Sequence, residues 1–210
     1  MKHTLLFLAA ASLALLAGCE QASEAKKSYN AIVTTTKAAE SLSASMEEAQ
    51  THQAERVKRG DTLSINYKEL HKLLPSAIEG YTAEGEPEGE SVQMPGMQYS
   101  STKQRYRKGE ETLSVQLVDY NGAATMFTAA TAMVGTGIAV EDETQLMRSL
   151  DLGMKGVKGY EKLDKQGHQA SVLLGVADRF FVTLEATGQK DTELVKSAAR
   201  QLKLSGLARM

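Results

Sequence analysis

The second half of the chain alternates between apolar and polar positions in a way that predicts an antiparallel sheet. From Thr112 to Tyr120, Leu113, Val115 and Leu117 alternate with serine and glutamine, which predicts one strand face on a core and the other in water. The strongest β-forming run extends from Ser171 to Leu184, and we expect it at the centre of the sheet. Further strands are expected over residues 98–107 and 160–163. Residues 144–152 fit either a helix or a strand, and we favour the strand.

Within the central run, Val172 and Phe181 are expected to point into the core, with Leu173 and Val182 on the opposite face. Residues 108–111 are expected to form a hairpin connection. Glycines and proline interrupt the acidic stretch over residues 84–90, so a solvated loop is expected there.

Three segments have the apolar spacing of helices: residues 66–74, 123–134 and 191–202. Pro75 follows the first segment and Gly135 the second, as helix stop signals do. The predicted fold class is therefore α+β: an antiparallel sheet of about six strands with two or three helices packed on one side, over residues 61–210.

Residues 23–59 contain no proline or glycine and are rich in alanine, serine, threonine, glutamate and lysine. Apolar residues recur at intervals of three and four, but large ones are too few for a coiled coil. We expect residues 19–60 to form a polar tether, either a helix or a flexible spacer, that ends at Gly60.

The first residues have the three parts of a signal peptide over residues 1–18. Lys2 is followed by an apolar run from Leu5 to Leu16, which is shorter than the roughly 20 residues that span a bilayer as a helix. The next residues, Leu16-Ala17-Gly18-Cys19, resemble the lipobox of bacterial lipoproteins. The resemblance implies cleavage between Gly18 and Cys19, and lipidation of Cys19. The alternative is an ordinary secretory signal that leaves a free thiol.

The resemblance also implies where the protein resides. In that family, aspartate after the cysteine tends to retain the protein at the inner membrane, whereas this chain has Glu20. We therefore expect an anchor in the outer membrane, facing the periplasm. A cell without an outer membrane would carry the protein on the outer face of its plasma membrane.

The net charge and the cysteine content exclude several classes of function. The net charge is −2, so the chain has no basic footprint for nucleic acid. The single cysteine, if lipidated, excludes disulfides, cysteine nucleophiles and cysteine-based metal sites. No catalytic residue, cofactor site or metal site is predicted, and beyond the lipobox the chain resembles no family of known function.

Several other residues have chemistry suited to a functional site but no supporting pattern. His71 and His168 lack partners at diagnostic spacing, and Met94 with Met97 fits packing in the core better than copper binding. Asp178-Arg179 is expected to form a structural ion pair in a turn.

Tyr81 and Tyr160 each follow a glycine, and we expect them to contact a partner, because tyrosine is favoured at binding surfaces. The expected function is a membrane-anchored, non-catalytic domain that binds an envelope protein or glycan. The alternative is a lipid-tethered hydrolase.

Overall fold

The computed structural model describes residues 40, 43–44, 46–134 and 137–210, which belong to a compact unit that extends from Ala38 to Met210. The expected signal peptide, its cleavage point and Cys19 lie outside these residues. A helix, described over residues 46–58, precedes the sheet. The later elements are α2 (Tyr67–His71), β1 (Ala77–Ile78), β2 (Tyr81–Met94), β3 (Met97–Lys108), β4 (Glu111–Gly122), α3 (Ala124–Ala130), β5 (Val140–Glu141), β6 (Gln145–Leu150), β7 (Val157–Asp164), β8 (Gln169–Val176), β9 (Phe180–Thr187), α4 (Glu193–Gln201) and α5 (Leu204–Leu207).

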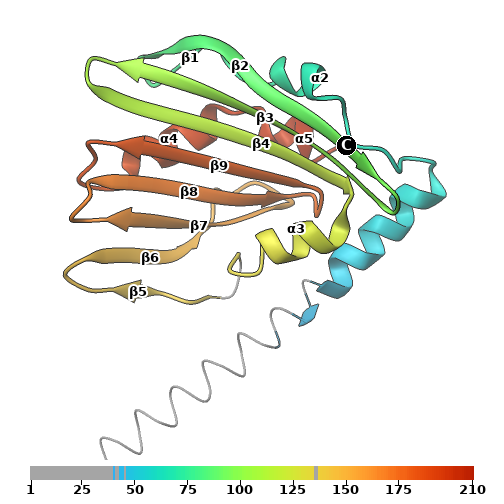
Figure 1. Ribbon diagram of the computed structural model, residues 1–210. Coiled ribbons are helices and arrows are strands. Elements are labelled where there is room, and N and C mark those ends of the chain that lie inside the picture. Colours follow the sequence, from blue (N-terminus) through green and yellow to red (C-terminus); the bar gives the residue numbers. More distant parts are fainter. Residues whose placement is uncertain (1–39, 41–42, 45, 135–136) are drawn as a thin grey trace, which may run out of the picture. The chain divides into compact units, whose positions relative to one another are not determined.

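The fold is α+β, and the described residues form one sheet in the order β1-β2-β3-β4-β9-β8-β7-β6-β5 (Figure 1). Every pair of neighbouring strands is antiparallel. The sheet has nine strands rather than about six. The expected centre is confirmed, because β9 occupies the middle position and β8 is its neighbour.

The core lies between the sheet and the helices α2, α4 and α5, which contribute Leu70, Val195 and Leu204 to it. The strands contribute buried residues at alternate positions, as in β8, where Val172 and Leu174 are completely buried. Apolar burial on this face is the main source of stability.

Phe181 does not point into this core as expected. Three residues, 177–179, separate the paired ends of β8 and β9. This register pairs Val172 with Leu184 and Leu174 with Val182, so even-numbered residues of both strands share the core face. Phe181 and Leu173 are half-buried on the other face, while Val182 is buried in the core. The expected face was therefore correct for Val172 and wrong for Phe181.

The acidic segment over residues 84–90 lies in β2 and is not a loop. Glu84 pairs with Arg105, and Glu88 with Lys103, in register across β2 and β3. Opposite charges on facing positions stabilise such pairs, and charged side chains suit a strand near the sheet edge. A register shift between Glu84 and Glu88 accommodates Pro87.

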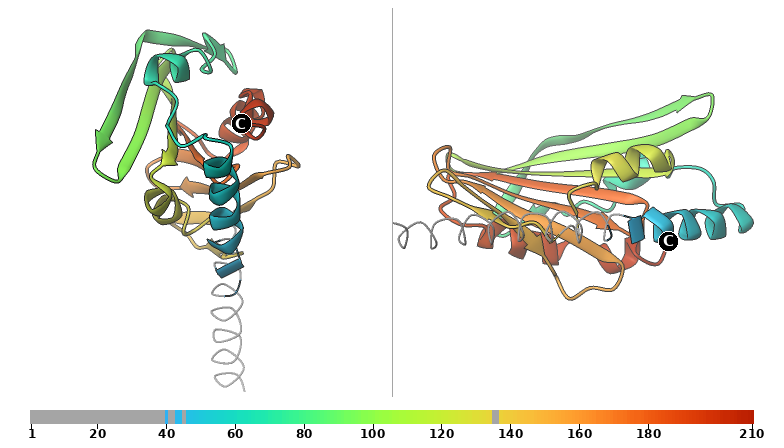
Figure 2. Two further views of the ribbon diagram at one scale, coloured as in Figure 1. Left: turned by 90° about the vertical axis from the view of Figure 1, so that its right-hand side faces the viewer. Right: turned by 90° about the horizontal axis from the view of Figure 1, so that it is seen from below.

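Helices cover both faces of the sheet, not one. In Figure 2 (left), α3 lies on the opposite side of the strands from α4 and α5. Gly175 of β8 permits this close approach, since a Cβ atom there would lie only 3.2 Å from Cγ2 of Thr131 and 3.4 Å from Cζ of Phe127. The face opposite the main core is thereby partly covered.

A buried carboxylate fixes α4 to the sheet. Glu161 of β7 is almost fully buried, accepts hydrogen bonds from Arg148 and from Thr192 at the start of α4, and lies 3.3 Å from Nζ of Lys196. Burial alone would raise the pKa of Glu161, but the hydrogen bonds from Thr192 and Arg148 and the charge of Lys196 together lower it.

Two adjacent leucines test the assignment of faces. Leu174→Ala leaves a cavity in the core and should lower the free energy of unfolding by roughly 2–5 kcal/mol. Leu173→Ala, on the half-buried face, should cost clearly less. Urea denaturation of both variants measures the difference, and equal losses would contradict the assignment.

Glu161→Leu should lower the free energy of unfolding at pH 7 by roughly 3–5 kcal/mol, because Lys196 and Arg148 lose their buried partner. The folded pKa of Glu161 is depressed, so its contribution is present above the ordinary value of 4.5 and is lost as the pH falls through the folded value. The stability gap between wild type and variant should therefore narrow below about pH 4.5. A gap that widens in acid would refute this role.

Candidate functional site

The helix over residues 46–58 carries Glu48, His52 and Arg56 at intervals of four, which places them on one side of the helix. Each contacts the sheet or its turns. Lys158 Nζ donates to Glu48 at 2.6 Å, and this hydrogen bond lowers the pKa of Glu48. His52 Nδ1 lies 2.6 Å from Oδ2 of Asp178. A polar stripe therefore faces the domain.

Arg56 is the buried member of this stripe. Its Nε donates to Oδ1 of Asn121 at 2.8 Å, and its two terminal nitrogens donate to the carbonyls of Ala177 and Asp178 at 3.3 and 3.1 Å. Burial lowers the pKa of Arg56, and the charge of Arg179 lowers it further. The guanidinium nevertheless stays charged near pH 7, because its ordinary pKa lies above 12.

A second arginine completes the cluster from the sheet side. Arg179 donates to both carboxylate oxygens of Asp119, at 2.9 and 2.8 Å, and to Asp61 at 2.9 Å. Asn121 Nδ2 donates to Oδ1 of Asp61 at 2.8 Å and to its backbone carbonyl at 3.1 Å. Arg56 thus joins the cluster through Asn121. The expected pairing within Asp178-Arg179 is not observed; the two residues bind different partners.

The turn between β8 and β9 is held by these groups. Ala177 and Asp178 have φ values of 54° and 51°, in the left-handed region that a type I′ turn requires at both central residues. Neither residue is glycine, so the conformation costs on the order of 1–3 kcal/mol per residue. The hydrogen bonds from Arg56 to both turn carbonyls offset part of that cost.

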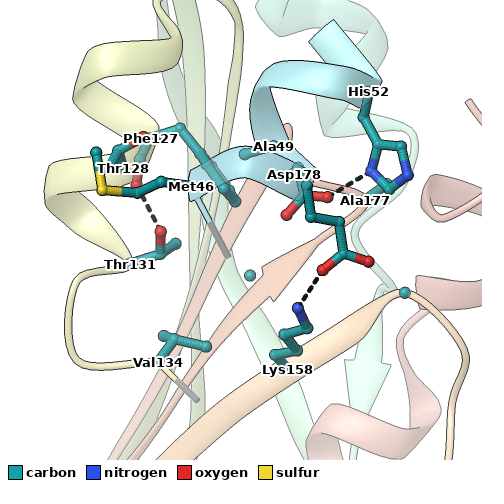
Figure 3. Close-up of a pocket in the computed structure, with 13 residues that line it drawn as sticks. Met46, Ala49, His52, Phe127, Thr128, Thr131, Val134, Lys158, Ala177 and Asp178 are labelled. Carbon is teal, nitrogen blue, oxygen red and sulfur yellow. Dashed lines mark hydrogen bonds and ion pairs between the residues drawn. The ribbon is translucent and has the colours of Figure 1, made fainter. Parts of the chain in front are cut away.

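Between this helix, α3 and the ends of β7 and β8 lies an open groove with a volume of about 80 Å³ (Figure 3). Apolar side chains and glycines form much of its lining, and the Glu48–Lys158 and His52–Asp178 pairs stand at its side. The described residues that line it are Met46, Glu48, Ala49, His52, Phe127, Thr128, Thr131, Val134, Gly156, Lys158, Gly175, Ala177 and Asp178.

The polar side chains around the groove already have hydrogen-bond partners. Thr128 and Thr131 donate their hydroxyl protons to carbonyls of their own helical segment, at 3.1 and 2.8 Å. The ionisable side chains along the groove are hydrogen-bonded to one another, Glu48 to Lys158 and His52 to Asp178. An apolar group can therefore enter without stripping water from an isolated charge.

The two tyrosines expected at a partner surface lie elsewhere. Tyr81 is 2% exposed, and its hydroxyl donates to Glu111 at 2.5 Å. Burial and the neighbouring Glu111 raise the pKa of Tyr81 to about 12. It belongs to the core and cannot serve as an exposed contact. Tyr160 lies half-buried on the sheet face away from the main core, where it pairs with Leu173 across β7 and β8. Burial raises the pKa of Tyr160.

The histidines and methionines weighed earlier do not converge. His71 packs its ring against Tyr67 on α2, and His168 lies in the exposed turn before β8 with a φ of 49°. Met94 and Met97 face each other at the end of the β2–β3 hairpin. In the part of the chain that the structure describes, no three histidine, cysteine or acidic side chains gather as a metal site would require.

His52 and Arg56 are the residues that sequence reasoning missed, and Asp178 was expected to pair with Arg179 instead of His52. The segment was interpreted through its sparse apolar residues, although Val57, one of them, is 55% exposed. The recurrence of Glu48, His52 and Arg56 every fourth residue was the available signal. The compact unit begins at Ala38, so the expected boundary between residues 60 and 61 passes through this set of contacts.

The chain matches no family model, no curated protein and no solved structure. Among the described residues, no helix is long and apolar enough to cross a membrane.

Arg56→Ala should lower the free energy of unfolding by on the order of 2–3 kcal/mol, because it leaves Asn121 and two turn carbonyls without their charged donor. Arg59→Ala is the matched control, since Arg59 is exposed one turn further along the chain. Equilibrium denaturation measures the free energy of unfolding of both variants. Equal stability of the two would refute a role for Arg56 in holding the helix.

Proposed function

We propose that the chain is a bacterial envelope lipoprotein, lipidated at Cys19 and anchored at the periplasmic face of the outer membrane. Leu16-Ala17-Gly18-Cys19 and the following Glu20 support the anchor and its destination. The domain that begins at Ala38 acts as a non-catalytic binding module for another envelope component.

The groove beside α3 is the observation that carries the binding role. Its lining includes Phe127, Val134 and Met46, and the polar side chains beside it are already hydrogen-bonded in pairs. Such a concave, mostly apolar site with a few polar groups at its side is typical of ligand pockets. An apolar side chain of a partner, or the apolar part of a small ligand, fits this chemistry.

A tethered hydrolase is the second candidate, and the contact between His52 and Asp178 favours it. A histidine whose Nδ1 meets a carboxylate can act as a base through its other ring nitrogen. The groove hydroxyls of Thr128 and Thr131 donate to backbone carbonyls, so a water molecule would have to be the nucleophile. A binding role requires no water nucleophile.

Lipidation is tested by labelled palmitate and by the mass of the mature chain. The wild type should incorporate palmitate and begin at Cys19, whereas Cys19→Ser should do neither. Absence of label in the wild type, or identical maturation of both chains, would exclude the anchor.

The choice between binding and catalysis is tested by His52→Gln and Val134→Asp in a deletion strain. Glutamine can still donate to Asp178 but cannot act as a base, so His52→Gln should preserve function. Val134→Asp places a charge in the groove and should abolish recovery of the partner from cross-linked cells. His168→Ala, in an exposed turn, is the control. Loss of function in a folded, membrane-bound His52→Gln chain would establish the hydrolase instead.

A further inference from the structure

The surface beside the groove has an unusual lack of charge. From Tyr120 to Val140 the sequence contains no acidic, basic or histidine residue, yet much of this stretch lies at the surface. We call the exposed part of it, together with the neighbouring Met46, the α3 surface; its residues are Thr125, Met126, Ala129, Met133 and Met46. The three methionines are 36%, 41% and 40% exposed, in the order Met126, Met133, Met46.

A surface helix normally has a charged side facing water. The exposed side of α3 has only threonine, alanine and methionine, so it can leave water without desolvating an ionised group. Methionine is flexible and adapts to irregular apolar surroundings. The α3 surface therefore fits an apolar medium or an apolar partner.

Its size favours a lipid surface over a free protein partner. The seven residues of α3 extend over only about 10 Å at 1.5 Å per residue. A stable protein interface buries roughly 800 Å² on each partner, which this short helix alone does not provide. A weak contact is sufficient only if something else keeps the partner at high local concentration.

The proposed lipid anchor would keep the α3 surface at high local concentration near the bilayer. Cys19 lies 38 − 19 = 19 residues before Ala38, where the compact unit begins. An extended chain spans at most about 3.3–3.6 Å per residue, so the unit stays within roughly 65 Å of its lipid. Met46, at the start of the described helix, belongs to the α3 surface and is among the parts of the unit nearest in sequence to the anchor.

We propose that the α3 surface docks onto the bilayer that holds the lipid, and so fixes the orientation of the groove relative to the membrane. This inference rests on the proposed lipid anchor. Because the surface has no charged residue of its own, docking should depend little on the headgroup charge or on salt concentration. The apolar side chains insert at the level of the headgroups, as apolar faces of interfacial helices do.

A fluorescent probe on a unique thiol tests the proposal. In the lipidated full chain Cys19 is blocked, so Met126→Cys supplies the only free thiol for an environment-sensitive dye. The matched control is Arg200→Cys, exposed on α4 at the opposite sheet face. In phosphatidylcholine vesicles with spin-labelled lipid, the dye at position 126 should be quenched several-fold more than the dye at position 200. Adding Ala129→Glu should reduce that quenching to the control value.

Flotation of the same vesicles distinguishes failure of the lipid anchor from failure of α3-surface docking. A wild-type chain that fails to float shows that the anchor is wrong, and docking falls with it. A chain that floats but whose two dyes are quenched equally overturns docking alone. Loss of quenching above 0.5 M salt also contradicts the uncharged contact. A dye at position 126 that is shielded only when another envelope protein is added assigns the α3 surface to a protein partner.

Discussion

The buried pair of Arg179 and Asp119 is the interaction on which one whole end of the domain depends. Both side chains are almost inaccessible to water, and the guanidinium bridges both carboxylate oxygens. Two buried charges are tolerated only when their remaining hydrogen-bonding capacity is also satisfied. Asp119 therefore also accepts from the backbone nitrogens of Ile65 and Asn121, and Arg179 also donates to Asp61. The segment that contains Asp61 and Ile65 is thereby bound to the middle of the sheet.

The hydrogen bonds around Arg179 and Asp119 continue to the helix over residues 46–58 and to the groove. Asn121 connects the pair to Arg56, and Arg56 holds the strained turn between β8 and β9. The helix over residues 46–58 meets the domain largely through this polar stripe, so the space between it and α3 stays open as the groove. In a lipid-anchored protein, the same helix would lead from the membrane to the proposed binding site.

The strands could be predicted wherever each buries one face, because alternation then appears directly in the sequence. The regions around β4 and the β8–β9 hairpin were expected for this reason, and the structure confirms both. The strand over residues 84–90 was missed, because its glutamates face cationic residues on β3 and produce no apolar alternation. The inward position of Phe181 was wrong, because it depended on how the turn aligns the two strands.

The site was harder to predict, since it is assembled from long-range polar contacts. His52 and Asp178 are separated by 126 residues, and Arg56 and Asn121 by 65. Neither pair has a spacing that a local pattern can reveal. Tyr81 was expected at the surface because tyrosine is common in interfaces, yet its ring lies in the core and its hydroxyl donates to Glu111.

The central claim is that residues 46–58 are an integral part of the domain. Site-resolved amide hydrogen exchange of the full mature chain tests it most directly, because local opening free energies distinguish docked from frayed segments. The account predicts that amides around His52 and Arg56 exchange far more slowly than an unstructured peptide, with opening free energies approaching those of β8 and β9. Exchange at unstructured rates over residues 46–58, with the sheet fully protected, would contradict it.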